Sequence, residues 1–258
     1  MNKDSAIAVV GGLVFFTVLI GMSQGIVAVN VAVSPAVPWF PLAAIALVGA
    51  AVAGANRLWS LRLNVPATGR AYAAAILLNF SVLCFGVIEF WWNDVATPAP
   101  TWPDDTLSAG FQLAYLFTLP VVAAVLAEIG FRGVIQTALE KVWSHWPVIF
   151  AIAVLNLLMH FYDPDQFKQV FRLIALNIVW GWITWRTGSI RPALAAHVAM
   201  NIGIAALQVW MENYGPGPLE FGSFRTSTVI IWAVIGSVTL AAGLALCRSP
   251  FLVSDTKI

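Results

Sequence analysis

Charged side chains are scarce in this sequence. Only 10% of its 258 residues are Asp, Glu, Lys or Arg, whereas a soluble domain carries about a quarter. Because 60% of the residues are hydrophobic and the mean hydropathy is +0.86, the chain cannot cover a water-facing surface and must be solvated by lipid. In lipid, every backbone N–H and C=O must be bonded within the protein, which leaves helices or a closed barrel. The apolar runs of about 20 residues are continuous rather than alternating, so we predict an all-α, polytopic membrane protein.

Cysteine and net charge are low as well. The two cysteines, Cys84 and Cys247, lie far apart inside apolar runs, which excludes a disulfide framework and predicts buried free thiols. A net charge of +1 offers no basic surface for nucleic acid. The first apolar run lacks a small-residue cleavage site, so we interpret it as a retained span rather than a signal peptide.

Eight transmembrane helices are predicted from the apolar runs. They lie near residues 6–29, 37–55, 71–92, 110–139, 147–162, 167–186, 189–210 and 227–247. Turn residues separate them, such as Asp163-Pro164-Asp165 between the fifth run and the sixth. No internal repeat is visible, which argues against a small transporter. We predict a single transmembrane domain over residues 1–258.

The distribution of Lys and Arg predicts that both termini are cytoplasmic. In that orientation, nine basic residues face the cytoplasm: Lys3, Arg57, Arg62, Arg70, Lys141, Arg186, Arg191, Arg248 and Lys257. Three face the other side, namely Lys168, Arg172 and Arg225. Tryptophans near the ends of the spans, such as Trp143, Trp146 and Trp185, are typical of the aromatic belt at a membrane interface rather than of a cofactor site.

Ionisable residues inside the spans are few. Each one is a functional candidate, because an unpaired charge in the bilayer costs several kcal/mol. Glu128 and Arg132 lie four residues apart in the fourth predicted span, so one helix face carries both and the two can pair. Two interpretations stay open: a structural ion pair that holds the bundle together, or part of a reaction site.

Two further polar pairs have helical spacing. Asn156 and His160 lie one turn apart at the end of the fifth span, and His197 and Asn201 lie in the seventh. Taken alone, His160 is typical of a hydrogen-bonded interface residue, and the seventh-span pair is typical of hydrogen bonding between helices. A His and an Asn that point together into a bundle could also hold a water, a carbonyl oxygen or a metal. Because three separate spans each carry a polar pair in an otherwise aliphatic core, the set predicts a buried reaction site.

The three pairs together resemble the motifs of the CPBP family of intramembrane proteases, which includes the type II CAAX prenyl endopeptidases. Where the family has Glu-Glu-x-x-x-Arg-Gly, this chain reads Ala127-Glu128-Ile-Gly-Phe131-Arg132-Gly133. The family's Phe-x-x-x-His is matched by Asn156-x-x-x-His160, and its His-x-x-x-Asn by His197-x-x-x-Asn201. The order and the spacing agree over about residues 120–205, which lie in a predicted catalytic-like core at about 110–210.

The resemblance implies a role for each matched position. The first glutamate of the family's first motif is taken as the general base, which activates water together with the second-motif histidine. Ala127 stands at that position, so this chain lacks the base there, and Glu128 would be the second, mainly structural glutamate, paired with Arg132. His160 would orient the nucleophilic water. The third-motif residues, His197 and Asn201, would stabilise the oxyanion.

A second departure from the family is Asn156, which replaces the phenylalanine of the second motif and is predicted to change packing or to add a hydrogen bond near His160. Two origins stay open for Ala127. It is either a Glu→Ala inactivation of a protease or the native residue of a pseudoprotease that binds a membrane helix or acts as an immunity protein. Zinc, held by His160 and His197 with a glutamate, is the less favoured alternative to a glutamate mechanism, since Asn is a poor ligand and the sequence lacks His-Glu-x-x-His.

The resemblance also implies a substrate and a location. We expect an endopeptidase that cleaves a membrane-associated protein or lipid-anchored peptide near its C-terminal anchor, with no cofactor. The expected location is the cytoplasmic membrane of a bacterium or archaeon. Because His160 lies close to the turn predicted to face outward, the site is predicted to open toward the outer leaflet.

Overall fold

The computed structural model is all-helical over the residues that it describes, which are 3–59, 61–92, 107–160, 169–214 and 226–248. The helices are α1 (Lys3–Val33), α2 (Phe40–Leu58), α3 (Gly69–Trp92), α4 (Ala109–Ala127), the π-helix η1 (Glu128–Gln136), α5 (Thr137–Leu139), α6 (His145–Leu158), α8 (Val170–Thr187), α9 (Arg191–Tyr214) and α10 (Thr226–Leu246). Because α4, η1 and α5 follow one another without a break, these ranges contain eight helical stretches, in the order of the eight predicted spans. The all-α prediction is confirmed.

Five of the helical stretches in the described ranges are long and apolar enough to cross a membrane. They are α1, α2, α3, the continuous stretch from α4 to α5, and α10. The apolar helix α6 has 14 residues and is therefore about 21 Å long, shorter than a hydrocarbon core of about 30 Å. The count of eight spans and the cytoplasmic placement of both termini stay predictions. Lys168, Arg225, Lys257 and the turn at 163–165, on which they partly depend, lie outside the described residues.

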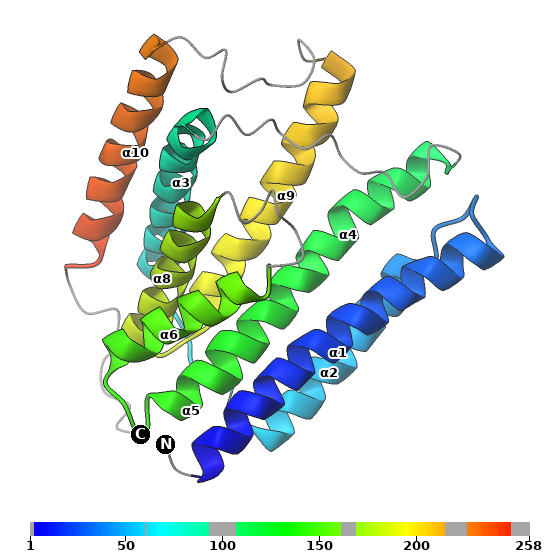
Figure 1. Ribbon diagram of the computed structural model, residues 1–258, viewed down its shortest axis with the longest axis horizontal. Coiled ribbons are helices and arrows are strands. Elements are labelled where there is room, and N and C mark those ends of the chain that lie inside the picture. Colours follow the sequence, from blue (N-terminus) through cyan, green and yellow to red (C-terminus); the bar gives the residue numbers. More distant parts are fainter. Residues whose placement is uncertain (1–2, 60, 93–106, 161–168, 215–225, 249–258) are drawn as a thin grey trace.

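The helices form two groups around the long rod of α4 and η1 (Figure 1). Helices α1 and α2 pack against each other and against α4, and α3 packs against α10 on the opposite side of the bundle. Helices α8 and α9 fill the space between α4 and α3. Segments far apart in the sequence therefore meet along η1, α8 and α9. The two cysteines are buried and unpaired, as predicted.

Local capping fixes where the central helices begin and end. Ser108 stands at the N-cap of α4, where its hydroxyl accepts a hydrogen bond from the Phe111 backbone N–H at 3.2 Å. Helix α8 ends at Gly188, whose φ of +64° is left-handed and favours glycine. Pro192 follows at the second position of α9, where its missing N–H leaves no intrahelical bond unmade. The connection from α8 to α9 is therefore sharp, and it holds the two helices side by side.

Helix α1 approaches η1 closely at Gly12, where no larger side chain fits. A Cβ atom built on Gly12 would lie 2.5 Å from Cγ1 of Ile135 and 3.0 Å from the carbonyl oxygen of Gly130. The β-branched side chain of Ile135 is stiff, and the Gly130 oxygen belongs to the backbone, so neither can yield at low cost. Gly12 thus sets the distance between α1 and the segment that carries Glu128.

Replacing this glycine should loosen the bundle. We expect Gly12→Ala to lower the free energy of unfolding by about 1–3 kcal/mol, because overpacking a tight contact forces the backbone apart. Gly21→Ala on the same helix is the matched control, since its new Cβ would meet no atom within 4 Å. The measurement is thermal unfolding of the two proteins in the same detergent. Equal melting temperatures of the two variants would show that the close approach of α1 to η1 does not contribute to stability.

Candidate active site

The segment that carries the first motif is a π-helix rather than the regular α-helix that the sequence predicts. All nine residues of η1 are buried, and its backbone closes i→i+5 turns that are wider than those of an α-helix. The hydroxyl of Thr137 also reaches back five residues and donates to the carbonyl oxygen of Arg132 at 3.2 Å. Such π segments often occur at functional sites. Glu128 and Arg132 still lie on one face of this wider helix, where they contact each other.

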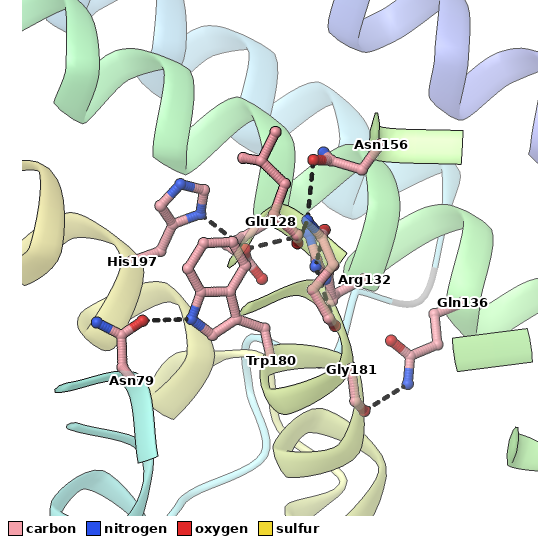
Figure 2. Close-up of polar contacts among 10 residues, drawn as sticks. Asn79, Glu128, Arg132, Gln136, Asn156, Trp180, Gly181 and His197 are labelled. Carbon is pink, nitrogen blue, oxygen red and sulfur yellow. Dashed lines mark hydrogen bonds and ion pairs between the residues drawn. The ribbon is translucent and has the colours of Figure 1, made fainter. Parts of the chain in front are cut away.

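Glu128 is the centre of the buried charge. Its Oε1 atom lies 3.2 Å from Nη1 of Arg132 and 2.9 Å from Nδ1 of His197 on α9. The side chains of Glu128 and Arg132 are both fully buried, and that of His197 is 12% exposed. The predicted ion pair is present, and it includes a third member from a helix almost 70 residues further along the chain (Figure 2).

Arg132 extends this network through a residue that the sequence analysis did not single out. Its Nη2 donates to the side-chain and backbone oxygens of Asn177 on α8. The Asn177 amide in turn donates to Oδ1 of Asn156 at 3.1 Å and to the carbonyl oxygen of Leu173 at 2.8 Å. A polar side chain in the middle of a predicted span was the available signal for Asn177. Asn177 is neither ionisable nor part of a matched motif, so the sequence did not mark it as a site residue.

Asn156 adds a hydrogen bond one turn before His160, and the partner of its side chain is Asn177 rather than His160 itself. Its side chain points to Asn177, and only its backbone oxygen meets His160, 2.9 Å from the Nδ1 atom. The reason is the start of the turn beyond Leu158: His160 folds back on its own helix, whereas Asn156 still faces the bundle. Within the described ranges, no hydrogen bond or ion pair joins His160 to Glu128 or His197.

Ala127 and Glu128 are neighbours in sequence, yet they face different helices. Ala127, 5% exposed, belongs to an apolar cluster with Val148 and Ile152 of α6, against which Met159 also packs. Glu128 faces α9 instead. The two neighbouring side chains therefore have different surroundings: Ala127 lies in an apolar cluster with residues of α6, and Glu128 contacts His197 of α9.

Asn201 lies one turn beyond His197 on α9, and it contacts α4 rather than Glu128. Its amide donates to the carbonyl oxygen of Pro120 at 2.7 Å. An asparagine amide has two N–H donors, so one remains for a ligand after this bond. The bond also holds α9 against α4.

The ring of His197 is oriented by its partner. An ionised carboxylate only accepts hydrogen bonds, so the Nδ1 atom that faces Glu128 carries a proton, and Nε2 is the atom left for a substrate. A neutral ring would then accept at Nε2, whereas donation to an oxyanion requires the doubly protonated ring. The carboxylate of Glu128 is placed to balance that positive charge.

Two more side chains complete the surroundings of His197 and were missed from the sequence. The indole of Trp180 on α8 stacks on the imidazole, with 3.9 Å between ring centroids and 15° between planes. Asn79 on α3 accepts a hydrogen bond from the indole Nε1 at 3.0 Å. The aromatic-belt interpretation fits tryptophans at span ends, but Trp180 is buried in the middle of α8.

A metal centre finds little support among the side chains. Over the described residues, no three His, Cys, Asp or Glu side chains gather closely enough to hold a metal ion. The Nδ1 atom of His197 faces Glu128 and that of His160 faces a backbone oxygen, and such contacts leave Nε2 as the ring atom that a metal would use. Whether the chain uses a metal or a cofactor stays a prediction.

Comparison with known proteins is confined to one match. Residues 109–203 match the family model described as type II CAAX prenyl endopeptidase, Rce1-like, whereas searches of curated proteins and of solved structures find no match. The matched stretch begins with α4, ends within α9, and contains every residue predicted for the site, from Ala127 to Asn201. Because five helical stretches of the described residues are long and apolar enough to cross a bilayer, the chain is an integral membrane protein. Residues 109–203 are therefore similar to the Rce1-like type II CAAX prenyl endopeptidases, a protease family within the CPBP group that the motifs of this chain resemble.

Proposed function

We propose that this chain is the scaffold of an intramembrane endopeptidase that cleaves a membrane-associated protein or peptide near its C-terminal anchor. In the active form, a glutamate at position 127 and His160 would activate water, and His197 and Asn201 would bind the oxyanion. With Ala127, the chain lacks the proton acceptor, and we propose that this form does not cut. The direct test is Ala127→Glu, in which cleavage of a membrane-anchored reporter should appear.

The proposal rests on the different surroundings of the two adjacent side chains at positions 127 and 128. Glu128 is held by Arg132 and His197 at 3.2 and 2.9 Å, so it is occupied as a structural and orienting group. Position 127 faces the apolar cluster beside the end of α6, where a longer acidic side chain would reach toward His160. The geometry therefore supports separate roles for the two motif positions, with the reactive one at Ala127.

A binding protein is the second candidate, and the buried network favours it to a degree. Arg132, Asn177 and Asn156 are joined by buried hydrogen bonds that do not depend on the residue at position 127, so a scaffold with Ala127 could be kept for binding a membrane helix without any chemistry. An Ala127→Glu protein that is folded, yet inactive on prenylated and helix-anchored reporters alike, would favour this second function.

We propose further that the reaction needs no metal and occurs in the cytoplasmic membrane of a bacterium or archaeon. The matched residues that could bind zinc are His160, His197 and Glu128, of which Glu128 is already held by Arg132 and His197, and Asn201 is a poor ligand. Elemental analysis of purified Ala127→Glu protein before and after chelation tests this point. Cleavage that survives chelation supports the glutamate mechanism, and cleavage that requires added zinc contradicts it.

The side of the membrane to which the end of α6 opens can be measured by thiol labelling. Leu158, the last residue of α6, and Trp143, before its first residue, are 46% and 44% exposed. In a background with Cys84 and Cys247 replaced by alanine, we expect Leu158→Cys to react with a membrane-impermeant maleimide from outside the cell. Trp143→Cys, near the basic residue Lys141, should react only after the cell is opened.

The pair of variants makes the labelling internally controlled. The reverse pattern would place the N-terminus outside and the site toward the cytoplasmic leaflet. Labelling of both positions from one side would show that α6 returns to the surface from which it enters, which is compatible with its length of about 21 Å.

A further inference from the structure

The indole of Trp180 contacts two charged or polar members of the site at once. It stacks on His197 at 3.9 Å between centroids, and the Arg132 guanidinium carbon lies 5.3 Å from its centroid. Both of these residues contact Glu128. Four side chains from η1, α8 and α9 thus form a closed set of contacts (Figure 2), in which Trp180 is the only member without a charge or a titratable group.

The indole itself is held from outside the matched family segment. Its Nε1–H donates to Oδ1 of Asn79 at 3.0 Å, and both residues are buried, at 3% and 5% exposure. Asn79 lies on α3, 30 residues before the segment 109–203 that matches the family model. An indole N–H can only donate, so without Asn79 it would be a buried donor that has lost its acceptor, and the ring could turn about its side-chain bonds.

The orientation of His197 depends on two constraints. Glu128 fixes the direction of Nδ1, but one hydrogen bond allows the imidazole to rotate about that axis. The stacked indole, nearly parallel at 15°, fixes the plane of the ring. Together the two constraints determine where Nε2 points, and Nε2 is the atom that would meet the substrate.

We propose that Asn79 is a positioning residue for His197 and that it acts through Trp180. The inference rests on the proposed function, since His197 matters for reaction only if the scaffold supports hydrolysis. It extends the functional site to α3, which carries none of the matched motifs. The alternative is a plain structural bond between α3 and α8, which would leave the His197 ring unaffected when it is broken.

Histidine NMR on the chain with Ala127 separates the two without any activity assay. The chain has three histidines, so a histidine-labelled sample in detergent gives a simple spectrum, assigned by His197→Gln. We expect Asn79→Leu to shift the His197 ring resonances, because the ring current of Trp180 moves. His145 is the internal reference, since it stacks on Trp185 at 3.7 Å and should not shift. Trp180→Phe should shift His197 as well, and adding Asn79→Leu to it should change nothing more.

Ser81→Ala is the matched control for a structural role. Ser81 lies two residues from Asn79 on α3, is equally buried, and donates to the Gly236 oxygen of α10 at 2.8 Å. Its loss breaks a bond between helices without touching Trp180. Unchanged His197 resonances in Asn79→Leu, or equal shifts in Ser81→Ala, would overturn the proposal.

Kinetics in the Ala127→Glu background give the second readout. A small misplacement of a catalytic group can cost up to about 100-fold, so Asn79→Leu should lower kcat by about 10- to 100-fold and leave KM nearly unchanged. Ser81→Ala should leave both unchanged. An unaltered kcat in Asn79→Leu would contradict the positioning role. If Ala127→Glu itself is inactive, the proposed function fails, while the NMR result still decides whether Asn79 orients His197.

Discussion

A glutamate at position 127 should give this chain proteolytic activity. A well-placed general base contributes about 10²–10⁴-fold to a reaction rate, and this is the one contribution that the first motif lacks. The other matched residues are in place: Glu128, Arg132, His160, His197 and Asn201. We therefore expect Ala127→Glu, reconstituted in lipid vesicles, to cleave an anchored reporter at least about 100-fold faster than the chain with Ala127.

Ala127→Gln is the matched control, because glutamine has the size and shape of glutamate but cannot accept a proton in this role. Both variants enlarge a side chain in an apolar cluster, which costs about 1–3 kcal/mol, so their folded fractions are compared first by thermal unfolding. Reporters with a prenylated C-terminal peptide and with a transmembrane anchor cover the two substrate classes. Equal rates for the two variants, both folded, would refute a base at position 127.

Removing the carboxylate of Glu128 should destabilise the bundle more than any other single change in the site. Breaking a buried ion pair from one side costs about 3–5 kcal/mol, because the remaining charge is left without compensation. Arg132 is fully buried, so Glu128→Leu leaves a cation in an apolar interior. We expect a matching loss in the free energy of unfolding, measured in the same detergent as the parent chain.

The double variant Glu128→Leu/Arg132→Met tests the cause of that loss. With both charges gone, no ion is left unpaired, and the stability should return most of the way to the parent value. Arg132 also donates to Asn177, so part of the loss will persist. Losses that simply add in the double variant would show that the two residues act independently, and that their contact at 3.2 Å contributes little.

Local sequence spacing predicted the contact within one helix of the site. The contacts between different helices could not be predicted in this way. The pairing of Glu128 with Arg132 follows from two residues one turn apart, and it remained possible in the π-helix. The contact from Glu128 to His197 joins different helices, and no local pattern specifies which faces of two helices meet. The contacts of Asn177 with Arg132 and of Trp180 with His197 also join different helices. Neither residue belongs to one of the three polar pairs at helical spacing, so the sequence did not single them out.

The fold was predictable because the solvent leaves few alternatives. Long apolar runs in lipid must be helical, and the boundaries follow from residues such as Ser108 and Gly188, whose capping chemistry is local. The π geometry of η1 was not predictable in this way, since its sequence is as compatible with an α-helix. Tertiary contacts that the sequence does not specify surround this segment, among them the close approach of α1 at Gly12 and the hydrogen bond from Gln136 to the Gly181 oxygen of α8.

The π-helix also changes the directions in which side chains point along the continuous stretch from α4 to α5. Each residue of an α-helix advances the chain by about 100°, and a π turn contains one residue more than an α turn. The side chains after η1 are therefore rotated relative to the pattern that α4 would have continued. Deleting Val134 or Ile135, which follow the first motif at 127–133, would remove the extra residue of one π turn. The residues from Ala127 to Gly133 would keep their spacing, whereas Gln136 and the residues after it would turn away from α8. A one-residue gap at 134–135 in a relative would thus mark a change of helical phase that leaves the motif intact.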